Sequence, residues 1–164
     1  MQILFSDTTF LGKPANYAII DKFVSRSAQP KKEDIEWLKS QGITDIFNFR
    51  SMHSPDINYN EETEVKKASI RYHNIPSITR KPTEENIDTF LKEIEEVKQR
   101  GGKAHIHCKA GADRTGMYAF IYETINGIKT LPKSQAEWFE HGYHYKLYPG
   151  LMEWTRNFVL KFMK

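Results

Sequence analysis

The only cysteine of this 164-residue chain lies in segment 107–116, where five residues separate it from an arginine. A cysteine thiolate is a nucleophile, and the planar guanidinium of Arg114 can hold two oxygens of a phosphate group. An apolar stretch at 104–107 precedes Cys108 and a helical pattern at 114–126 follows, so we expect the cysteine where a strand turns into a helix. The spacing therefore indicates nucleophilic chemistry on a bound anion.

Such a turn can form an anion cradle. Its backbone N–H groups can point at one site, and the first turn of the following helix adds unpaired donors and the positive end of its dipole. The same donors stabilise a thiolate at Cys108, and Gly111 permits a positive φ and a close approach of the anion. The alternative is a buried structural cysteine beside a helix N-terminus. The residues expected to bind the anion are Lys109, Ala110, Gly111, Ala112, Asp113 and Arg114.

The pattern His-Cys-x5-Arg-Thr-Gly resembles the phosphate-binding loop of the cysteine-dependent phosphatases of the tyrosine and dual-specificity superfamily. The resemblance implies that Cys108 attacks phosphorus to form a phosphocysteine, which water then hydrolyses, while Arg114 holds the equatorial oxygens. It also implies that Thr115 donates a hydrogen bond to the cysteine sulfur. We expect His107 to orient the loop through its ring hydrogen bonds rather than to act as a base.

The general acid departs from the usual dual-specificity pattern, because the loop at 76–82 contains no aspartate. Proton donation to the leaving group is typically worth around 10²–10⁴-fold in rate. We prefer Asp113, because Asp-Arg-Thr-Gly resembles the loop of myotubularin-type lipid phosphatases and of some bacterial tyrosine and lipid phosphatases. Glu84 or Glu85, at the start of the next helix, is the alternative.

Two arginines outside the loop are further candidates for the site. Arg26 begins Arg-Ser-Ala-Gln-Pro, which resembles a pentapeptide of many bacterial phosphatases of this superfamily and of some atypical fungal and plant relatives; we expect it to be a structural partner of a carboxylate or carbonyl. Arg50 follows a strand at the edge where open α/β sheets bind ligands, and it either lines the site or forms a structural ion pair. Either arginine could instead pair with Asp113 and brace the loop. Arg80 and Lys81 could attract an anionic substrate or simply be solvated.

Helical and strand patterns alternate along the chain. Short strands are expected at 17–20 and 23–24, and longer ones at 43–49, 70–75 and 103–107. Helices are expected at 31–40, 61–68, 84–100, 114–126, 132–140 and 149–163. This alternation indicates an α/β fold with a single mostly parallel central sheet of about four to five strands flanked by helices, and the resemblance implies a dual-specificity phosphatase-like arrangement. The apolar stripe expected in the core or an interface is Leu147, Leu151, Trp154, Phe158 and Phe162.

A length of 164 residues fits one domain, 1–164. Its 39% hydrophobic and 27% charged residues are ordinary for a soluble globular protein. A formal charge of +3 with interleaved acids and bases argues against a nucleic-acid partner. A single cysteine forms no internal disulfide, which favours a reducing, cytoplasmic location. Segment 1–10 carries acid and lacks a long apolar run, so we expect neither a signal peptide nor an integral membrane segment, although a signal removed beforehand would leave no trace.

We expect no cofactor and no metal, because His53, His73, His141 and His144 lack metal-ligand spacing; the first two are interpreted as ordinary loop or surface residues. The sequence and the resemblance predict a phosphomonoester hydrolase of the tyrosine and dual-specificity type, with phosphotyrosine-containing protein as the preferred substrate. Phosphoinositide or inositol phosphate is the alternative substrate, because Lys109 resembles the basic lining of phosphoinositide-directed members. A rhodanese-type sulfurtransferase and an inactive phosphate-binding module are more remote alternatives. The oligomeric state does not follow from the sequence.

Overall fold

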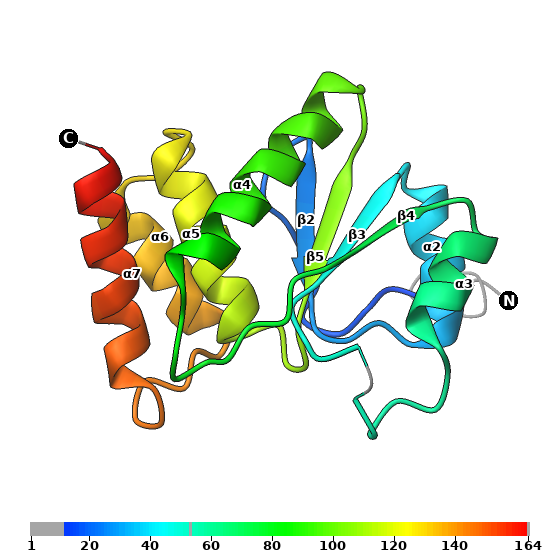
Figure 1. Ribbon diagram of the computed structural model, residues 1–164, viewed down its shortest axis with the longest axis horizontal. Helices are drawn as coiled ribbons and strands as arrows, with labels where there is room; N and C mark the ends of the chain where they lie inside the picture. Colours follow the sequence, from blue (N-terminus) through cyan, green and yellow to red (C-terminus); the bar gives the residue numbers. More distant parts are fainter. Residues whose placement is uncertain (1–11, 53, 164) are drawn as a thin grey trace, which may run out of the picture.

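The computed structural model describes residues 12–52 and 54–163, and its strands form one five-stranded sheet (Figure 1). The strands are β1 (Ala18–Ile19), β2 (Val24–Ser27), β3 (Asp45–Asn48), β4 (Arg71–Asn74) and β5 (Ala104–His107). Their order is β1-β2-β5-β3-β4, with β1 antiparallel to β2 and all other neighbours parallel. The expected mostly parallel sheet is confirmed. Segment 1–10 and His53 lie outside the described residues, so the expectations about them stay predictions.

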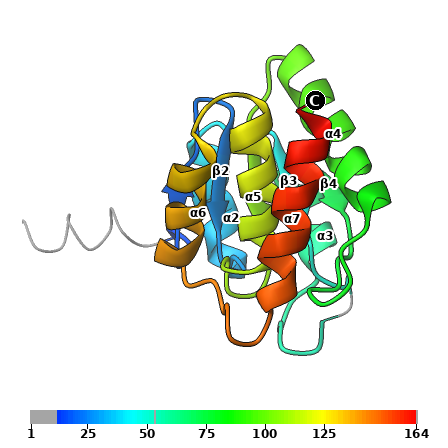
Figure 2. The ribbon, with the colours of Figure 1, turned by 90° about the vertical axis from the view of Figure 1, so that its left-hand side faces the viewer.

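The described helices cover both faces of the sheet. They are α2 (Lys32–Ser40), α3 (Glu61–Lys67), α4 (Glu84–Gln99), α5 (Arg114–Ile125), α6 (Leu131–Glu140) and α7 (Pro149–Phe162). α2 and α3 pack on one face, and the other four helices lie on the opposite face (Figures 1 and 2). Neighbouring residues of β3 accordingly enter different cores: Ile46 packs in the cluster that includes α2 and α3, and Phe47 in the larger cluster on the other side.

β5 is the central strand, and it ends level with its two neighbours. His107 is the register partner of Ser27 on β2 and of Asn48 on β3. The carboxyl ends of three parallel strands therefore meet at one edge of the sheet, where the loops that follow them converge. The loop of residues 108–113 begins at this edge and leads into α5.

α5 is buried along almost its whole length, as its wide apolar arc predicts. Every residue from 115 to 124 is buried. Tyr118 stacks on Phe49 with ring centroids 3.8 Å apart, and its hydroxyl lies 2.6 Å from the Ser77 hydroxyl. This packing fixes the helix that follows the cysteine loop, which is a requirement for a preorganised site.

One expectation about burial was wrong, and the C-terminal apolar stripe lies only partly in the core. His73 is not an ordinary loop or surface residue: it lies on β4, and its ring nitrogens are each 2.7 Å from a carboxylate, that of Asp45 on β3 and that of Glu93 on α4. Both partners come from other elements, so no local pattern reveals them. Part of the C-terminal apolar stripe lies outside the core, because Leu147 precedes α7 and is 56% exposed, while Phe162 at the end of the helix is 54% exposed.

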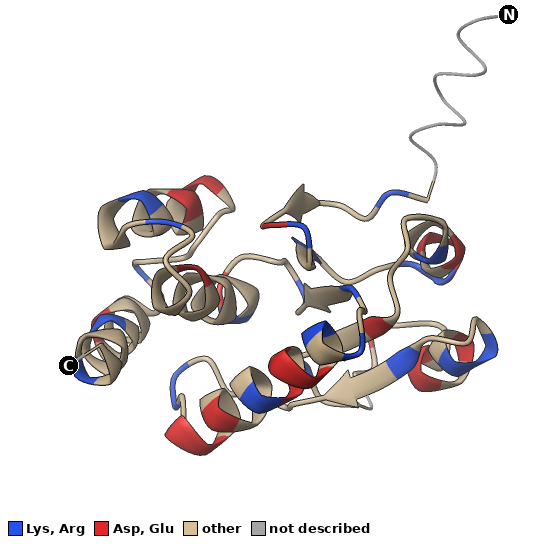
Figure 3. Ribbon diagram, turned by 90° about the horizontal axis from the view of Figure 1, so that it is seen from above, with Lys and Arg blue, Asp and Glu red and all other residues tan. Residues whose placement is uncertain are grey.

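Acidic and basic residues are interleaved on the helices (Figure 3). On α3, Lys66 pairs with Glu62 at 2.7 Å and Lys67 with Glu64 at 3.4 Å. None of the helices in the described ranges combines the length and apolar character needed to cross a membrane.

Candidate active site

The loop between β5 and α5 turns its carbonyl groups outward. Each carbonyl oxygen from residue 108 to residue 113 accepts a hydrogen bond of 2.9 to 3.1 Å. All six donors lie outside the loop of residues 108–113, and the last of them belongs to α5. In order from Cys108 to Asp113, the donors are the His107 ring, the Gln29 N–H, the Asn16 amide, the Arg26 guanidinium, the Trp138 indole and the Met117 N–H.

The N–H groups of the same loop are left unpaired. None of the backbone N–H groups from residue 109 to residue 114 donates a hydrogen bond to a residue that the structure describes. Because the carbonyl groups face outward, these N–H groups face the inner side of the loop, next to the N-terminus of α5. Unpaired donors in this arrangement bind an anion.

Cys108 and Arg114 lie at the two ends of this loop. Cys108 is buried, with 2% of its surface exposed. One terminal nitrogen of Arg114 is 3.5 Å from the Phe49 carbonyl oxygen and 3.3 Å from that of Ser77, which holds the guanidinium at the carboxyl edge of the sheet. Thr115 Oγ1 is buried and has no hydrogen-bond partner among the described residues, so the bond to the Cys108 sulfur implied by the resemblance is not formed in this structure.

The pentapeptide 26–30 packs against the cysteine loop and supports it. Gly111 has a φ of +72° and lies against β2, where a Cβ atom would come within 2.6 Å of the Ala28 nitrogen and of the Ser27 carbonyl carbon. Glycine is therefore required both by the backbone conformation and by the space. Arg26 donates a 3.0 Å hydrogen bond to the Gly111 carbonyl, and the Gln29 N–H donates one of 2.9 Å to residue 109. These contacts give the pentapeptide a physical role in shaping the cradle.

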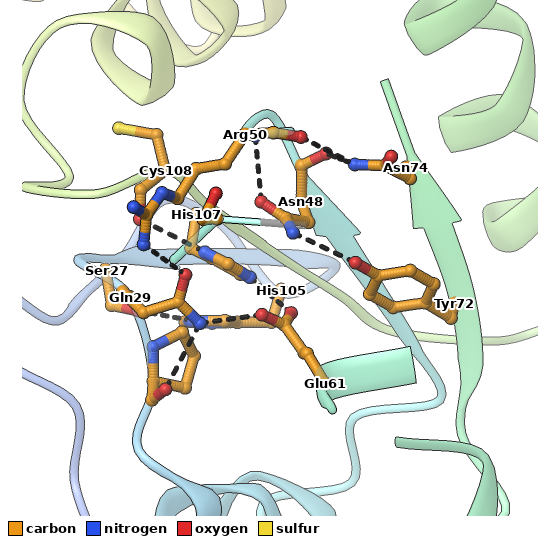
Figure 4. Close-up of polar contacts among 12 residues, drawn as sticks. Ser27, Gln29, Asn48, Arg50, Glu61, Tyr72, Asn74, His105, His107 and Cys108 are labelled. Atoms are coloured by element: carbon orange, nitrogen blue, oxygen red, sulfur yellow. Dashed lines mark hydrogen bonds and ion pairs between the residues drawn. The ribbon is translucent and has the colours of Figure 1, made fainter. Parts of the chain in front are cut away.

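A chain of polar side chains continues from the cysteine loop (Figure 4). His107 Nε2 lies 2.6 Å from Glu61 Oε2, and the other oxygen of Glu61 accepts a 2.6 Å hydrogen bond from the Gln29 amide. The Gln29 oxygen accepts a 2.9 Å hydrogen bond from Arg50, and Arg50 forms an ion pair with Asp56 at the far end of this hydrogen-bonded series. Burial disfavours the charge of Glu61, but attraction to His107 and the hydrogen bonds from His107 and Gln29 outweigh it and lower the pKa of Glu61. These side-chain contacts hold the His107 ring in place beside the cysteine.

The guanidinium of Arg50 is occupied by protein partners. It binds Gln29 and Asp56, and the residue is 5% exposed. The hydrogen bond from Arg50 is the main cause that lowers the pKa of Asp56. Of the two roles that the sequence left open for Arg50, these contacts correspond to the structural ion pair.

A loop with unpaired inward N–H groups, a cysteine at its head and an arginine at its end has the geometry of a phosphate site. The family model described as "DSP-PTPase phosphatase fused to NAD+ Kinase" matches residues 16–137, more than half of the chain. The chain belongs to this phosphatase family. The search of curated proteins found no significant match.

Solved structures share the fold of the phosphatase at low identity. A DUF442 protein of Shewanella putrefaciens CN-32 that carries a phosphatase assignment is 20% identical over 92% of each chain, with a TM-score of 0.76. The catalytic core of the PP-IP phosphatase Siw14 of S. cerevisiae, in complex with citrate, is 16% identical over 85% of each chain, with a TM-score of 0.71. TpbA of P. aeruginosa, in complex with phosphotyrosine, is 18% identical over 88% of this chain and 82% of the other, with a TM-score of 0.68. At these identities the likeness shows the fold alone.

Asp113 of the phosphatase binds a histidine. Its Oδ1 accepts a 2.8 Å hydrogen bond from the backbone N–H of His144, and its Oδ2 lies 2.9 Å from Nδ1 of the same residue. The pairing of Asp113 with Arg26 or Arg50, which the sequence offered as a structural role, is not formed, because both guanidiniums have other partners. His144 comes from a loop 31 positions away, and no local pattern links the two residues.

The alternative acids lie at the start of α4. Glu84 is ion-paired with Lys161 on α7 at 2.8 Å, and Glu85 is exposed. Lys161 stands twelve positions after the first residue of α7, which corresponds to about 18 Å along a helix axis. Its pairing therefore directs the Glu84 carboxylate toward the C-terminal part of α7. Among the described residues, no three His, Cys, Asp or Glu side chains are grouped to hold a metal ion.

Arg80 of the loop at 76–82 also has partners within the protein. It lies 4.8 Å from the centre of the Tyr148 ring and 3.4 Å from the Leu147 carbonyl oxygen. The contact joins the loop at 76–82 to the loop before α7. Lys81 is exposed. Of the two cations that the sequence suggested at this rim, Lys81 makes no such contact with the part of the chain that the structure describes.

Behind the cradle lies a buried charge cluster that sequence reasoning missed. Arg26, 1% exposed, pairs with Glu137 on α6 at 3.3 Å, which agrees with the expected structural role. Glu137 also pairs with Lys129, whose Nζ is 3.2 Å from Glu123 on α5. Burial and the hydrogen bond with Glu137 raise the pKa of Glu123 to about 7. A glutamate within the apolar arc of α5 was the available signal, because a buried carboxylate requires partners.

Proposed function

We propose that the protein hydrolyses phosphomonoesters through a phosphocysteine formed on Cys108. The observation that carries the proposal is the orientation of the loop: six carbonyls are bound from outside, while the N–H groups of residues 109–114 have no partner among the described residues. A phosphoryl group in the loop would supply three oxygens for these donors and for the free nitrogens of Arg114. Such preorganised donors stabilise charge that develops in the transition state.

The reaction would proceed in two displacements. In the first, Cys108 Sγ attacks phosphorus, the bond between phosphorus and the leaving oxygen breaks, and that oxygen takes a proton from Asp113. In the second, water attacks the phosphocysteine and passes a proton to Asp113, and the thiolate leaves. The buried and unpartnered hydroxyl of Thr115 is available to stabilise the departing sulfur, and the Glu61 contact holds the His107 ring that binds the Cys108 carbonyl.

Asp113 is the acid that the contacts favour. It belongs to the cradle itself, and its side chain is 15% exposed. Glu84 faces a lysine of α7, and Glu85 is exposed at the start of α4. To act as the acid, Glu84 would have to give up its ion pair with Lys161, whereas Asp113 belongs to the cysteine loop and directly precedes Arg114.

For the substrate, we propose phosphotyrosine-containing protein. The contacts of Arg80 with Tyr148 and Leu147 hold this exposed cation against the loop before α7, which makes it less available to a polyanionic inositol headgroup. The TpbA structure with phosphotyrosine shows that this fold accepts that group in a related protein. Phosphoinositide or inositol phosphate is the second candidate, because Lys109 is exposed next to the nucleophile and Siw14, another protein of this fold, is a PP-IP phosphatase.

The reaction is tested by phosphate release from phosphotyrosine peptides, phosphoserine peptides, phosphoinositides and inositol phosphates, with thiosulfate as a sulfurtransferase substrate. We expect the fastest turnover on phosphotyrosine, no cyanide-dependent thiocyanate formation, and a phosphoenzyme that can be trapped by acid quench. Cys108→Ser should abolish both turnover and trapping. Phosphatase activity that survives Cys108→Ser would exclude the covalent mechanism, and preferential turnover of inositol lipids would exclude the proposed substrate.

The acid is tested separately with a series of aryl phosphates whose leaving groups differ in basicity. Asp113→Asn should lower kcat by about 10²-fold or more for poor leaving groups and by much less for good ones. The matched controls are Glu84→Gln and Glu85→Gln, which should leave this dependence unchanged. If a glutamate variant shows the effect and Asp113→Asn does not, the acid lies on α4.

A further inference from the structure

We propose that His144 is the positioning residue for the general acid, and that it keeps the Asp113 carboxyl group directed for proton transfer in both halves of the reaction. The inference rests on the proposed role of Asp113. It goes beyond that role, because it assigns to the loop before α7 a function that neither the cysteine loop nor its supporting pentapeptide performs.

Both oxygens of Asp113 are held by one residue. The backbone N–H of His144 donates to Oδ1 at 2.8 Å, and Nδ1 of its ring lies 2.9 Å from Oδ2. Two contacts from a single residue fix the rotation of the carboxyl plane, which one hydrogen bond would leave free. A proton donor needs this restriction, because transfer depends on a short and directed approach to the leaving oxygen.

His144 is itself held by its own loop. Its carbonyl oxygen accepts hydrogen bonds from the N–H groups of Leu147 at 3.1 Å and Tyr148 at 3.0 Å, which closes a turn around the residue. The beginning of the loop is tied to the cradle by Asn16, whose amide nitrogen donates to the carbonyls of Ala110 at 3.0 Å and His141 at 2.9 Å. The histidine loop is therefore tied to the cysteine loop before His144 and closed by its own hydrogen bonds after it.

An imidazole is suited to an acid that changes its protonation state twice per turnover. With its ring proton on Nδ1, His144 donates to Oδ2 whether Asp113 is protonated or ionised, so the single proton of the carboxyl group is carried by Oδ1 and stays available to the leaving oxygen. No proton is gained or lost by the ring over the cycle: Asp113 gives one to the leaving oxygen and recovers one from the attacking water.

The experiment compares His144→Ala, His144→Gln and His144→Asn on the aryl phosphate series. An asparagine amide can occupy the position of Nδ1, whereas a glutamine amide lies nearer that of Nε2. We expect the alanine and glutamine variants to lose about 10-fold in kcat on poor leaving groups, with KM and the rate on good leaving groups nearly unchanged. The asparagine variant should recover most of the loss. Lys146→Ala, an exposed change in the same loop, should show no leaving-group effect.

The outcomes separate this inference from the proposed function. If Asp113→Asn steepens the leaving-group dependence but His144→Ala and His144→Gln do not, His144 has no positioning role and Asp113 remains the acid. If Asp113→Asn has no such effect, the assignment of the acid itself fails. An equal loss on all leaving groups in the His144 variants would mean a general distortion of the loop, and would also overturn the inference.

Discussion

Arg26 and Gly111 lie 85 positions apart in the chain and are joined by a 3.0 Å hydrogen bond from the guanidinium to the carbonyl oxygen. The same glycine packs closely against the backbone of Ser27 and Ala28, which leaves no space for a Cβ atom. β2 thus shapes the cysteine loop by direct contact, although its residues make none of the proposed contacts with the phosphoryl group.

Gly111→Ala should reduce both stability and activity. The left-handed conformation alone costs a non-glycine residue about 1–2 kcal/mol, and the clash with β2 should add about 1–3 kcal/mol. Gly127→Ala is the matched control, because Gly127 has a φ of +68° with nothing within 4 Å of the added Cβ. Urea unfolding of the two variants isolates the contact with β2. Equal losses of unfolding free energy would show that β2 does not constrain the loop.

Arg26→Met should be strongly destabilising. It removes the donor to Gly111 and takes a positive partner from Glu137 within a buried cluster, and such losses cost about 3–5 kcal/mol. Arg156→Met is the comparison, since Arg156 is half-buried and binds the neutral side chain of Gln135 at 2.6 Å. We expect that control to lose about 1 kcal/mol and to keep its kcat. A similar loss in both variants would argue against a special role for the contact with the loop.

Thr115→Val should separate stability from catalysis. The Thr115 hydroxyl is buried without a partner, so its replacement by a methyl group should leave the free energy of unfolding unchanged or raise it by about 1 kcal/mol. If the hydroxyl stabilises the departing thiolate of Cys108, breakdown of the phosphocysteine in the valine variant should slow by about 10-fold or more. Thr115→Ser keeps the hydroxyl and should retain most of the rate. Acid-quench measurement of the phosphoenzyme would show its accumulation in the valine variant, and unchanged breakdown there would contradict this role.

His73 should make stability depend on pH above pH 6.5, the ordinary pKa of histidine. Burial acts against the charged ring, but the hydrogen bonds and attraction of Asp45 and Glu93 outweigh it and raise the pKa of His73 above 6.5. The folded state therefore binds the proton more tightly than the unfolded chain. The stabilisation is fully present below pH 6.5 and is lost as the pH rises through the raised pKa of the folded protein.

His73→Gln should remove that dependence. Urea unfolding between about pH 5 and about pH 9 should show a larger loss of unfolding free energy above about pH 6.5 in the native protein than in the variant. Arg100 also binds Asp45, at 2.8 Å, and stays charged over this range, so it does not contribute to the difference. Parallel curves for the two proteins would mean that His73 is not preferentially protonated in the folded state.

The local part of the site followed from the sequence. The apolar stretch before Cys108, the spacing to Arg114 and the helical pattern after it are short-range properties, and they place the cysteine at a strand-to-helix turn. The alternation of strands and helices likewise indicated the mostly parallel sheet, because parallel neighbours require crossovers of this kind.

Only the tertiary structure decided which side chains meet. Asp113 binds His144 rather than an arginine, Arg26 lies between Gly111 and Glu137, and His73 lies between two carboxylates. Each of these contacts joins segments that are distant in the chain, so no period or motif specifies it; the packing of helices against the sheet does. The sequence by itself determined that a cysteine and an arginine lie at the two ends of one short loop, because that relation is local in the chain. The structure determined how Asp113 and the loop are held, because their supports come from β2, α3, α6 and the loop before α7.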